Sequence, residues 1–233
     1  MDRRKDMARF YALLDRLGDR AGGKMMLGDC SGYMSWPDRG VYFFFEDGED
    51  RSDTGYGTRV VRVGTHALQE SSRATLWQRL KAHRGTSSTG GGNHRGSIFR
   101  LLVGTALAKR QPELAISTWD NGKSSDTGAR PAELPLEILV SETIRAMPVL
   151  WVKIDDAPGP NSLRAYIELN SIALLSNYSR PSLDGPSQNW LGRHCARELV
   201  RESGLWNQQH VGESHDPAFL DQFANLVDSV EQS

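Results

Sequence analysis

WPDRGVYFFFEDGEDRSDTGYGTRVVRVG, residues 36–64, is the stretch that decides the fold of this chain. A turn-forming Pro-Asp-Arg-Gly run precedes five consecutive β-branched or aromatic residues at 41–45, which predict a buried strand. Residues 59–64 have the same character and predict a second strand. The polar, glycine-rich segment between them predicts an antiparallel hairpin with a long loop.

Helical periodicity surrounds this hairpin on both sides. Apolar spacing, candidate caps and glycine or proline stops predict helices over 3–18, 73–84, 97–109, 162–176, 187–202 and 217–231. Val-Leu-Trp-Val-Lys-Ile at 149–154 predicts a third strand, whereas the Pro-, Gly-, Asp- and Ser-rich stretch from 111 to 135 predicts an irregular insertion.

These elements predict an α/β (α+β) fold in which a small, three-stranded, mixed antiparallel sheet is flanked by helices. The expected organisation is a catalytic-type domain over 39–180, with an irregular insertion at about 111–147. Helical extensions are expected at 1–38 and 181–233, the second packed on the same domain.

Composition is that of an ordinary globular protein. The 233 residues are 38% hydrophobic and 24% charged, and no apolar run is long enough to cross a bilayer. The first ten residues lack the apolar stretch of a signal peptide. Two cysteines supply neither a disulfide framework nor a zinc spacing, so a reducing cytoplasm is the expected compartment.

Charge is distributed unevenly along the chain. The net charge is −1, but residues 51–110 hold 11 Lys or Arg against 2 Asp or Glu, a balance of +9. Such a stretch predicts a surface that faces phosphates. The alternative is a solvated basic face that the acidic second half of the chain balances.

Five short features follow one another along the predicted elements. Gly40-Val41-Tyr42 and Arg62-Val63-Gly64 lie on the hairpin strands, Arg79 and His83 lie on the next helix, and Glu168 lies on the helix after the third strand. This ordered set resembles the GIY-YIG nuclease superfamily over roughly residues 39–180. The long hairpin loop and the Arg/His pair resemble its restriction-enzyme branch more than its smallest repair modules.

The resemblance implies a separate role for each of these residues in phosphodiester hydrolysis. Glu168 would be the single protein ligand of Mg²⁺ or Mn²⁺, since hard cations take oxygen ligands and Mg²⁺ commonly uses only one or two carboxylates. Arg79 would bind the non-bridging phosphate oxygens as a fork, with His83 on the same helix face. Tyr42 would hold or deprotonate the attacking water, and His83 would assist as general base.

The second motif departs from the family pattern, because Arg62 stands in the place of its tyrosine. Arginine stays protonated and cannot act as a base, although it can bind phosphate or favour a neighbouring tyrosinate. His66 is a candidate replacement, and Tyr56 is a weaker one. The family also tends to have an asparagine after the glutamate-bearing helix, for which the candidates are Asn177, Asp184 and Asn189.

Each catalytic candidate also has a structural interpretation. Tyr42 alone fits a core aromatic residue, although strand alternation places it opposite both its neighbours. Arg79 and His83 alone fit a solvated helix face. Glu168 lies in a largely apolar helix, so its carboxylate needs a metal or a salt bridge to Arg164 or Arg62.

The leading hypothesis is therefore a divalent-metal-dependent endonuclease that acts on DNA, with RNA left open, in restriction, defence or DNA processing. The basic side chains expected to contact the nucleic acid backbone are Arg59, Lys81, Arg84, His94 and Arg95. The alternative is a nucleic-acid-binding module that keeps the fold and has lost the chemistry. A third hypothesis is a partner-binding protein that acts through its acidic half. No membrane contact is expected, and the chain would be a monomer or a homodimer.

Overall fold

The computed structural model describes residues 2–122 and 127–231. At its centre is the predicted hairpin, formed by β2 (Gly40–Asp50) and β3 (Thr58–Gly64). The strands are antiparallel, with Tyr42 opposite Gly64 and Phe44 opposite Arg62. β2 continues five residues past the apolar run, so the connecting loop is shorter than the sequence predicts.

The sheet has four strands in the order β1-β4-β2-β3, and all its pairings are antiparallel. β4 (Pro148–Lys153) is the predicted third strand and pairs with β2. The prediction of three strands in a mixed sheet is wrong, because β1 (Met25–Met26) adds a fourth beside β4. A two-residue strand has no recognisable pattern in the sequence. β1 is defined by its pairing with the edge of β4.

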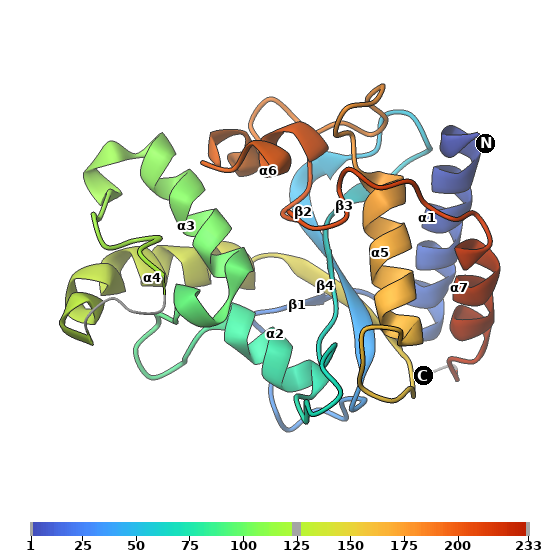
Figure 1. Cartoon of the computed structure of the whole chain (residues 1–233), viewed down its shortest axis with the longest axis horizontal. Helices are drawn as coiled ribbons and strands as arrows, with labels where there is room; N and C mark the ends of the chain where they lie inside the picture. The colour runs from blue at the N-terminus through green and yellow to red at the C-terminus, as the bar shows by residue number, and fades with distance from the viewer. Residues whose placement is uncertain (1, 123–126, 232–233) are drawn as a thin grey trace.

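Helices cover both faces of the sheet and make a three-layer molecule (Figure 1). One face packs on α1 (Arg3–Arg20), α5 (Leu163–Leu175) and α7 (Phe219–Asp228). The opposite face packs on α2 (Leu76–Arg84), α3 (Ile98–Arg110) and α4 (Arg130–Arg145). The central strands are therefore buried on both sides.

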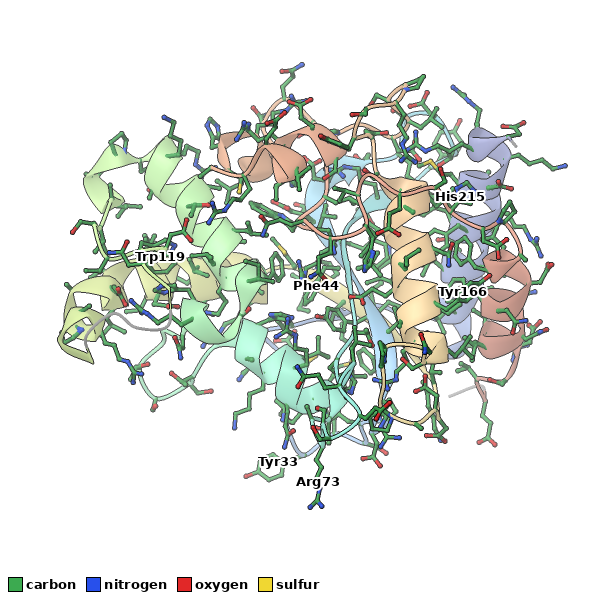
Figure 2. The ribbon with its side chains drawn as sticks, viewed as in Figure 1. Tyr33, Phe44, Arg73, Trp119, Tyr166 and His215 are labelled. Carbon is green, nitrogen blue, oxygen red and sulfur yellow. The ribbon has the colours of Figure 1, made fainter. Side chains whose placement is uncertain are left out.

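Alternation along β2 divides its side chains between two separate cores. Val41, Phe43 and Phe45 enter the α1/α5/α7 side, whereas Tyr42 and Phe44 enter the side of α2, α3 and α4. Figure 2 shows Phe44 between the sheet and these helices. The predicted opposition of Tyr42 to its neighbours is confirmed, because successive strand side chains point to opposite faces.

The predicted helices 3–18, 73–84, 97–109, 162–176 and 217–231 are confirmed to within a few residues at their ends. Four of them begin at side-chain caps, in which Asp2, Thr75, Ser97 and Ser162 accept hydrogen bonds from backbone N–H groups of the first turn. In the described ranges, no helix has the length and apolar character needed to span a membrane.

Two predictions fail in the second half of the chain. The irregular insertion at 111–147 contains α4, which buries Leu136, Val140 and Ile144 despite Pro135 in its interior. The helix predicted at 187–202 is instead a 3₁₀ turn, Leu191–His194, followed by the short α6 (Glu198–Ser203). Gly192 lies against the Trp190 ring there, where a β-carbon would have no room.

Three further 3₁₀ turns complete the secondary structure, at His94–Gly96, Pro112–Leu114 and Thr127–Ala129. Residues 123–126 of the predicted insertion lie outside the described residues. The same holds for residue 1 of the predicted N-terminal extension and for residues 232–233 of the C-terminal one.

Candidate active site

An open pocket of about 580 Å³ lies at the end of β3. Residues 65–68 and the C-terminal segment 207–210 line it together with side chains of α2, α3 and α5. Four of the six predicted catalytic residues meet there: Arg62, His66, Arg79 and Glu168. Folding gathers these residues from separate parts of the chain. Arg62 lies on β3 and His66 lies just after its end, whereas Arg79 and Glu168 come from helices on opposite sides of the sheet.

The other two, Tyr42 and His83, form a fully buried pair. The Tyr42 hydroxyl lies 2.8 Å from His83 Nε2, and His83 Nδ1 lies 2.7 Å from Ser97 Oγ. Burial, with smaller contributions from Arg79, Arg62 and Arg100, lowers the pKa of His83 well below its ordinary value. The imidazole is therefore neutral at pH 7, and the interpretation of His83 as part of a solvated helix face is wrong.

Gly64 makes room for this pair. A β-carbon on Gly64 would lie 2.3 Å from Tyr42 Oη and 2.4 Å from Tyr42 Cζ. Glycine in the second motif is thus required because the tyrosine ring of the first motif passes directly over the backbone of β3.

Gly64→Ala is expected to lower the free energy of unfolding by about 1–3 kcal/mol, the usual cost of overpacking a core. It should also separate Tyr42 from His83, because the hydroxyl is the nearest atom that can move. Gly18→Ala is the matched control: Gly18 lies inside α1, and no atom of the described part of the chain lies within 4 Å of a β-carbon there. That variant should gain about 0.5–1 kcal/mol, and urea denaturation of both will measure the contrast.

Arg62 links the buried pair to the pocket. Its side chain is 5% exposed, donates to the Trp206 carbonyl and lies 4.7 Å from the centre of the Phe99 ring. Burial lowers the pKa of Arg62, and electrostatic interactions with Tyr42 and Glu168 oppose that shift. The guanidinium thus lines the pocket with Glu168 and interacts electrostatically with Tyr42.

Glu168 points from α5 toward the end of β3, where its Oε1 accepts a hydrogen bond from the Thr65 N–H at 3.0 Å. Burial raises the pKa of this carboxyl group, chiefly against the charge of Arg62. Within residues 2–122 and 127–231, no basic nitrogen lies within 4.0 Å of it, and Arg164 pairs with Asp156 instead. The salt-bridge interpretation of Glu168 is therefore wrong.

The donor set fits a hard divalent cation held by one carboxylate. Glu168 is a half-buried carboxylate without an ion pair among the described residues, and no cluster of three or more His, Cys, Asp or Glu side chains in those ranges could hold a metal. Hard cations bound through one protein oxygen keep water or substrate oxygens as their other ligands.

Arg79 has an unused guanidinium. Its only described hydrogen bond is a long one, 3.5 Å from Nη1 to the Gly96 carbonyl, and its buried Nε has no partner among the described residues. The group lines the pocket with Glu168. An arginine fork held in this way is suited to the paired oxygens of a phosphate.

His66 is held at the pocket wall by a 3.2 Å contact from Nε2 to the Asp38 carbonyl, which places a proton on Nε2. Its Nδ1 is buried and unpartnered in the described part of the chain. Burial lowers the pKa of His66 to about 4, so the ring is neutral and Nδ1 is a proton acceptor at pH 7.

The predicted backbone-binding residues do not converge on the pocket. Arg59 is buried, with Nη2 2.5 Å from Glu49, so it is not available to a phosphate. His94 is buried against Glu137 and stacks on Trp119, and both fork nitrogens of Arg95 bind Glu133, at 2.6 and 2.7 Å. Lys81 is exposed on α2, and Arg84 donates to the Gly28 carbonyl.

The asparagine at the pocket is none of the three candidates from the sequence. Asn177 and Asp184 bind backbone groups elsewhere, and Asn189 is exposed. The pocket contains Asn207 instead, whose amide binds both the N–H and the carbonyl of Val63. In the sequence, the signal for Asn207 is its place at the start of the polar run that follows Trp206.

The α/β fold thus brings a carboxylate and an arginine fork together at the end of β3, beside a buried tyrosine-histidine pair. The family model of the GIY-YIG domain matches residues 1–233, so the chain belongs to the GIY-YIG nuclease superfamily. The match extends beyond the 39–180 region of the sequence motifs. No curated protein and no solved structure matches the chain.

Proposed function

We propose that this chain is a divalent-metal-dependent endonuclease that hydrolyses DNA phosphodiester bonds in the pocket at the end of β3. The observation that carries the proposal is that the carboxylate of Glu168 and the free fork of Arg79 line one open pocket. One group suits a cation and the other a phosphate, and a phosphodiester is the substrate that uses both.

Arg79 binds the non-bridging oxygens of the scissile phosphate and stabilises the extra negative charge of the pentacovalent transition state. Glu168 holds Mg²⁺ or Mn²⁺, which when bound supplies Lewis-acid stabilisation to the phosphate and the leaving oxygen. The family in general uses divalent metals for this purpose.

The nucleophilic water loses its proton to Tyr42. His83 is neutral and can receive the phenolic proton on Nε2 while Nδ1–H donates to Ser97 Oγ. Arg62 interacts electrostatically with Tyr42 and stabilises the phenolate, a role that needs a cation and not a second base. Because Tyr42 is fully buried, the side chains that cover it must move before a water molecule in the pocket can reach its hydroxyl.

The test is cleavage of supercoiled plasmid and of single-stranded DNA with Mg²⁺ or Mn²⁺, and with EDTA as the metal-free control. We expect nicked or linear plasmid only with the metal. Retention of intact plasmid under every divalent metal, with DNA binding preserved, would remove the catalytic proposal. A role in restriction, defence or DNA processing rests on the resemblance to the restriction-enzyme branch.

The second candidate function is a nucleic-acid-binding module without catalysis, and Arg62 is the observation that favours it. Under that alternative, DNA binding is salt-sensitive and no metal supports cleavage. Arg62→Tyr separates the two candidates: appearance of cleavage only in this variant would support the binding module. If the parent cuts, we expect Arg62→Tyr to cut more slowly, because the phenolate of Tyr42 loses its cation.

A further inference from the structure

The C-terminal segment that crosses the pocket is fixed to the free edge of β3. The Trp206 N–H donates to the Val61 carbonyl at 2.7 Å. The Asn207 amide then accepts from the Val63 N–H at 3.1 Å and donates to the Val63 carbonyl at 2.9 Å. The segment thus begins at the pocket in a position that the sheet determines.

The far end of the segment is fixed as well. His210 has a φ of +64°, which is uncommon for a residue with a side chain, and its Nδ1 lies 2.7 Å from Glu213 Oε1. Arg180 in turn donates to the Glu213 carbonyl at 2.8 Å. A backbone held at both ends presents its intervening side chains with little conformational freedom left to lose.

Gln208 and Gln209 are those intervening residues, and both line the pocket. Gln208 is partly buried and Gln209 is exposed, and neither side-chain amide makes a hydrogen bond within the described ranges. The segment therefore offers two uncharged donor-acceptor groups beside Arg79 and Glu168.

We propose that Gln208 and Gln209 read base edges next to the scissile phosphate and select adenine in the major groove of duplex DNA. A glutamine amide has a donor and an acceptor in one plane, which match the adenine N7 acceptor and N6 donor. Arg79 is the better phosphate ligand because it is charged, so neutral amides beside it are suited to bases. The inference rests on the proposed function, since it requires DNA in this pocket.

The experiment is a binding selection from a duplex library with a randomised core, in EDTA, followed by sequencing of the bound duplexes. We expect the parent to enrich adenine at one or two fixed positions. The double variant Gln208→Ala/Gln209→Ala should lower that enrichment about tenfold. Gln222→Ala, an exposed glutamine on α7, is the matched control and should keep the parent profile.

A change of preference provides a second readout. Glutamate accepts from the cytosine N4 amino group, so Gln208→Glu or Gln209→Glu should move the preference from adenine toward cytosine. Thermal unfolding of each variant will show that the fold is intact.

An unchanged profile in the double variant would overturn the inference, as would a parent that binds no duplex or enriches no base. The selection requires no chemistry, so the two proposals can fail separately. Adenine selection without metal-dependent cleavage contradicts the nuclease and leaves the base readout standing. Metal-dependent cleavage without any base preference contradicts the base readout and leaves the nuclease proposal standing.

Discussion

Glu168→Gln is expected to lower the rate of DNA cleavage by at least about a hundredfold, the scale of losing one preorganised electrostatic group in an active site. The substitution preserves the shape of the side chain and its acceptor oxygen for the Thr65 N–H. It removes only the negative charge on which a hard cation depends. Single-turnover cleavage of plasmid at saturating Mg²⁺ or Mn²⁺ will measure the loss.

Stability should move in the opposite direction from activity. Burial raises the pKa of Glu168, so the folded protein holds its proton more tightly than the unfolded chain does. Stability contributed by this group is therefore present below its ordinary pKa and is lost as pH rises through the raised folded value. Glu168→Gln should be at least as stable as the parent at neutral pH, with a smaller advantage in acid, as urea denaturation at both pH values will show.

Metal binding provides an independent readout of the same residue. Mn²⁺ should raise the melting temperature of the parent, because a ligand of the folded state alone stabilises it, and should leave Glu168→Gln unchanged. Affinity should weaken as pH falls through the raised pKa, since the proton and the cation compete for one carboxylate. Glu202→Gln on α6 is an exposed control. Equal cleavage by Glu168→Gln and the parent would contradict the metal assignment.

Local pattern was sufficient for the parts of the site that lie within one element. Alternation on β2 separates Tyr42 from Val41 and Phe43, and the i, i+4 spacing on α2 places Arg79 and His83 on one side of that helix. The spacing does not predict how deeply each side chain is buried: Arg79 reaches the pocket, whereas His83 points inward to Tyr42. The burial of His83 depends on contacts with α3 and Ser97, and the spacing of residues within α2 does not specify those contacts.

Residues that depend on distant partners were not predictable in the same way. Arg59 is a basic residue of the kind that binds phosphate. The hairpin nevertheless brings Glu49 against it, and both side chains are buried. Asn207 becomes part of the pocket only because the C-terminal segment returns to the edge of β3 and binds Val63. Basic charge in a sequence window identifies candidate ligands, and tertiary pairing decides which of them remain free.

Arg79→Lys is expected to reduce cleavage by about a hundredfold or more while the protein keeps its net charge. Lysine supplies a point charge, whereas the arginine fork can bind two phosphate oxygens at once. Among the residues that the structure describes, the present guanidinium makes only the long contact to Gly96 and its buried Nε has no partner, so the substitution removes little from the fold. Arg73→Lys is the matched control, because Arg73 projects into solvent just before α2 (Figure 2).

The rate and the affinity must be measured separately for this variant. If Arg79 acts on the transition state, Arg79→Lys lowers the single-turnover rate at saturating DNA and changes Kd little. A weaker Kd with an unchanged rate would show that Arg79 only binds the DNA. Stabilisation of the negative charge in the transition state would then be assigned to Arg62, the other arginine that lines the pocket. Because Arg62 already donates to the Trp206 carbonyl and interacts electrostatically with Tyr42, it is less free to follow the phosphate as charge develops. The geometry therefore favours Arg79 for the catalytic role, with Arg62 acting on the tyrosine.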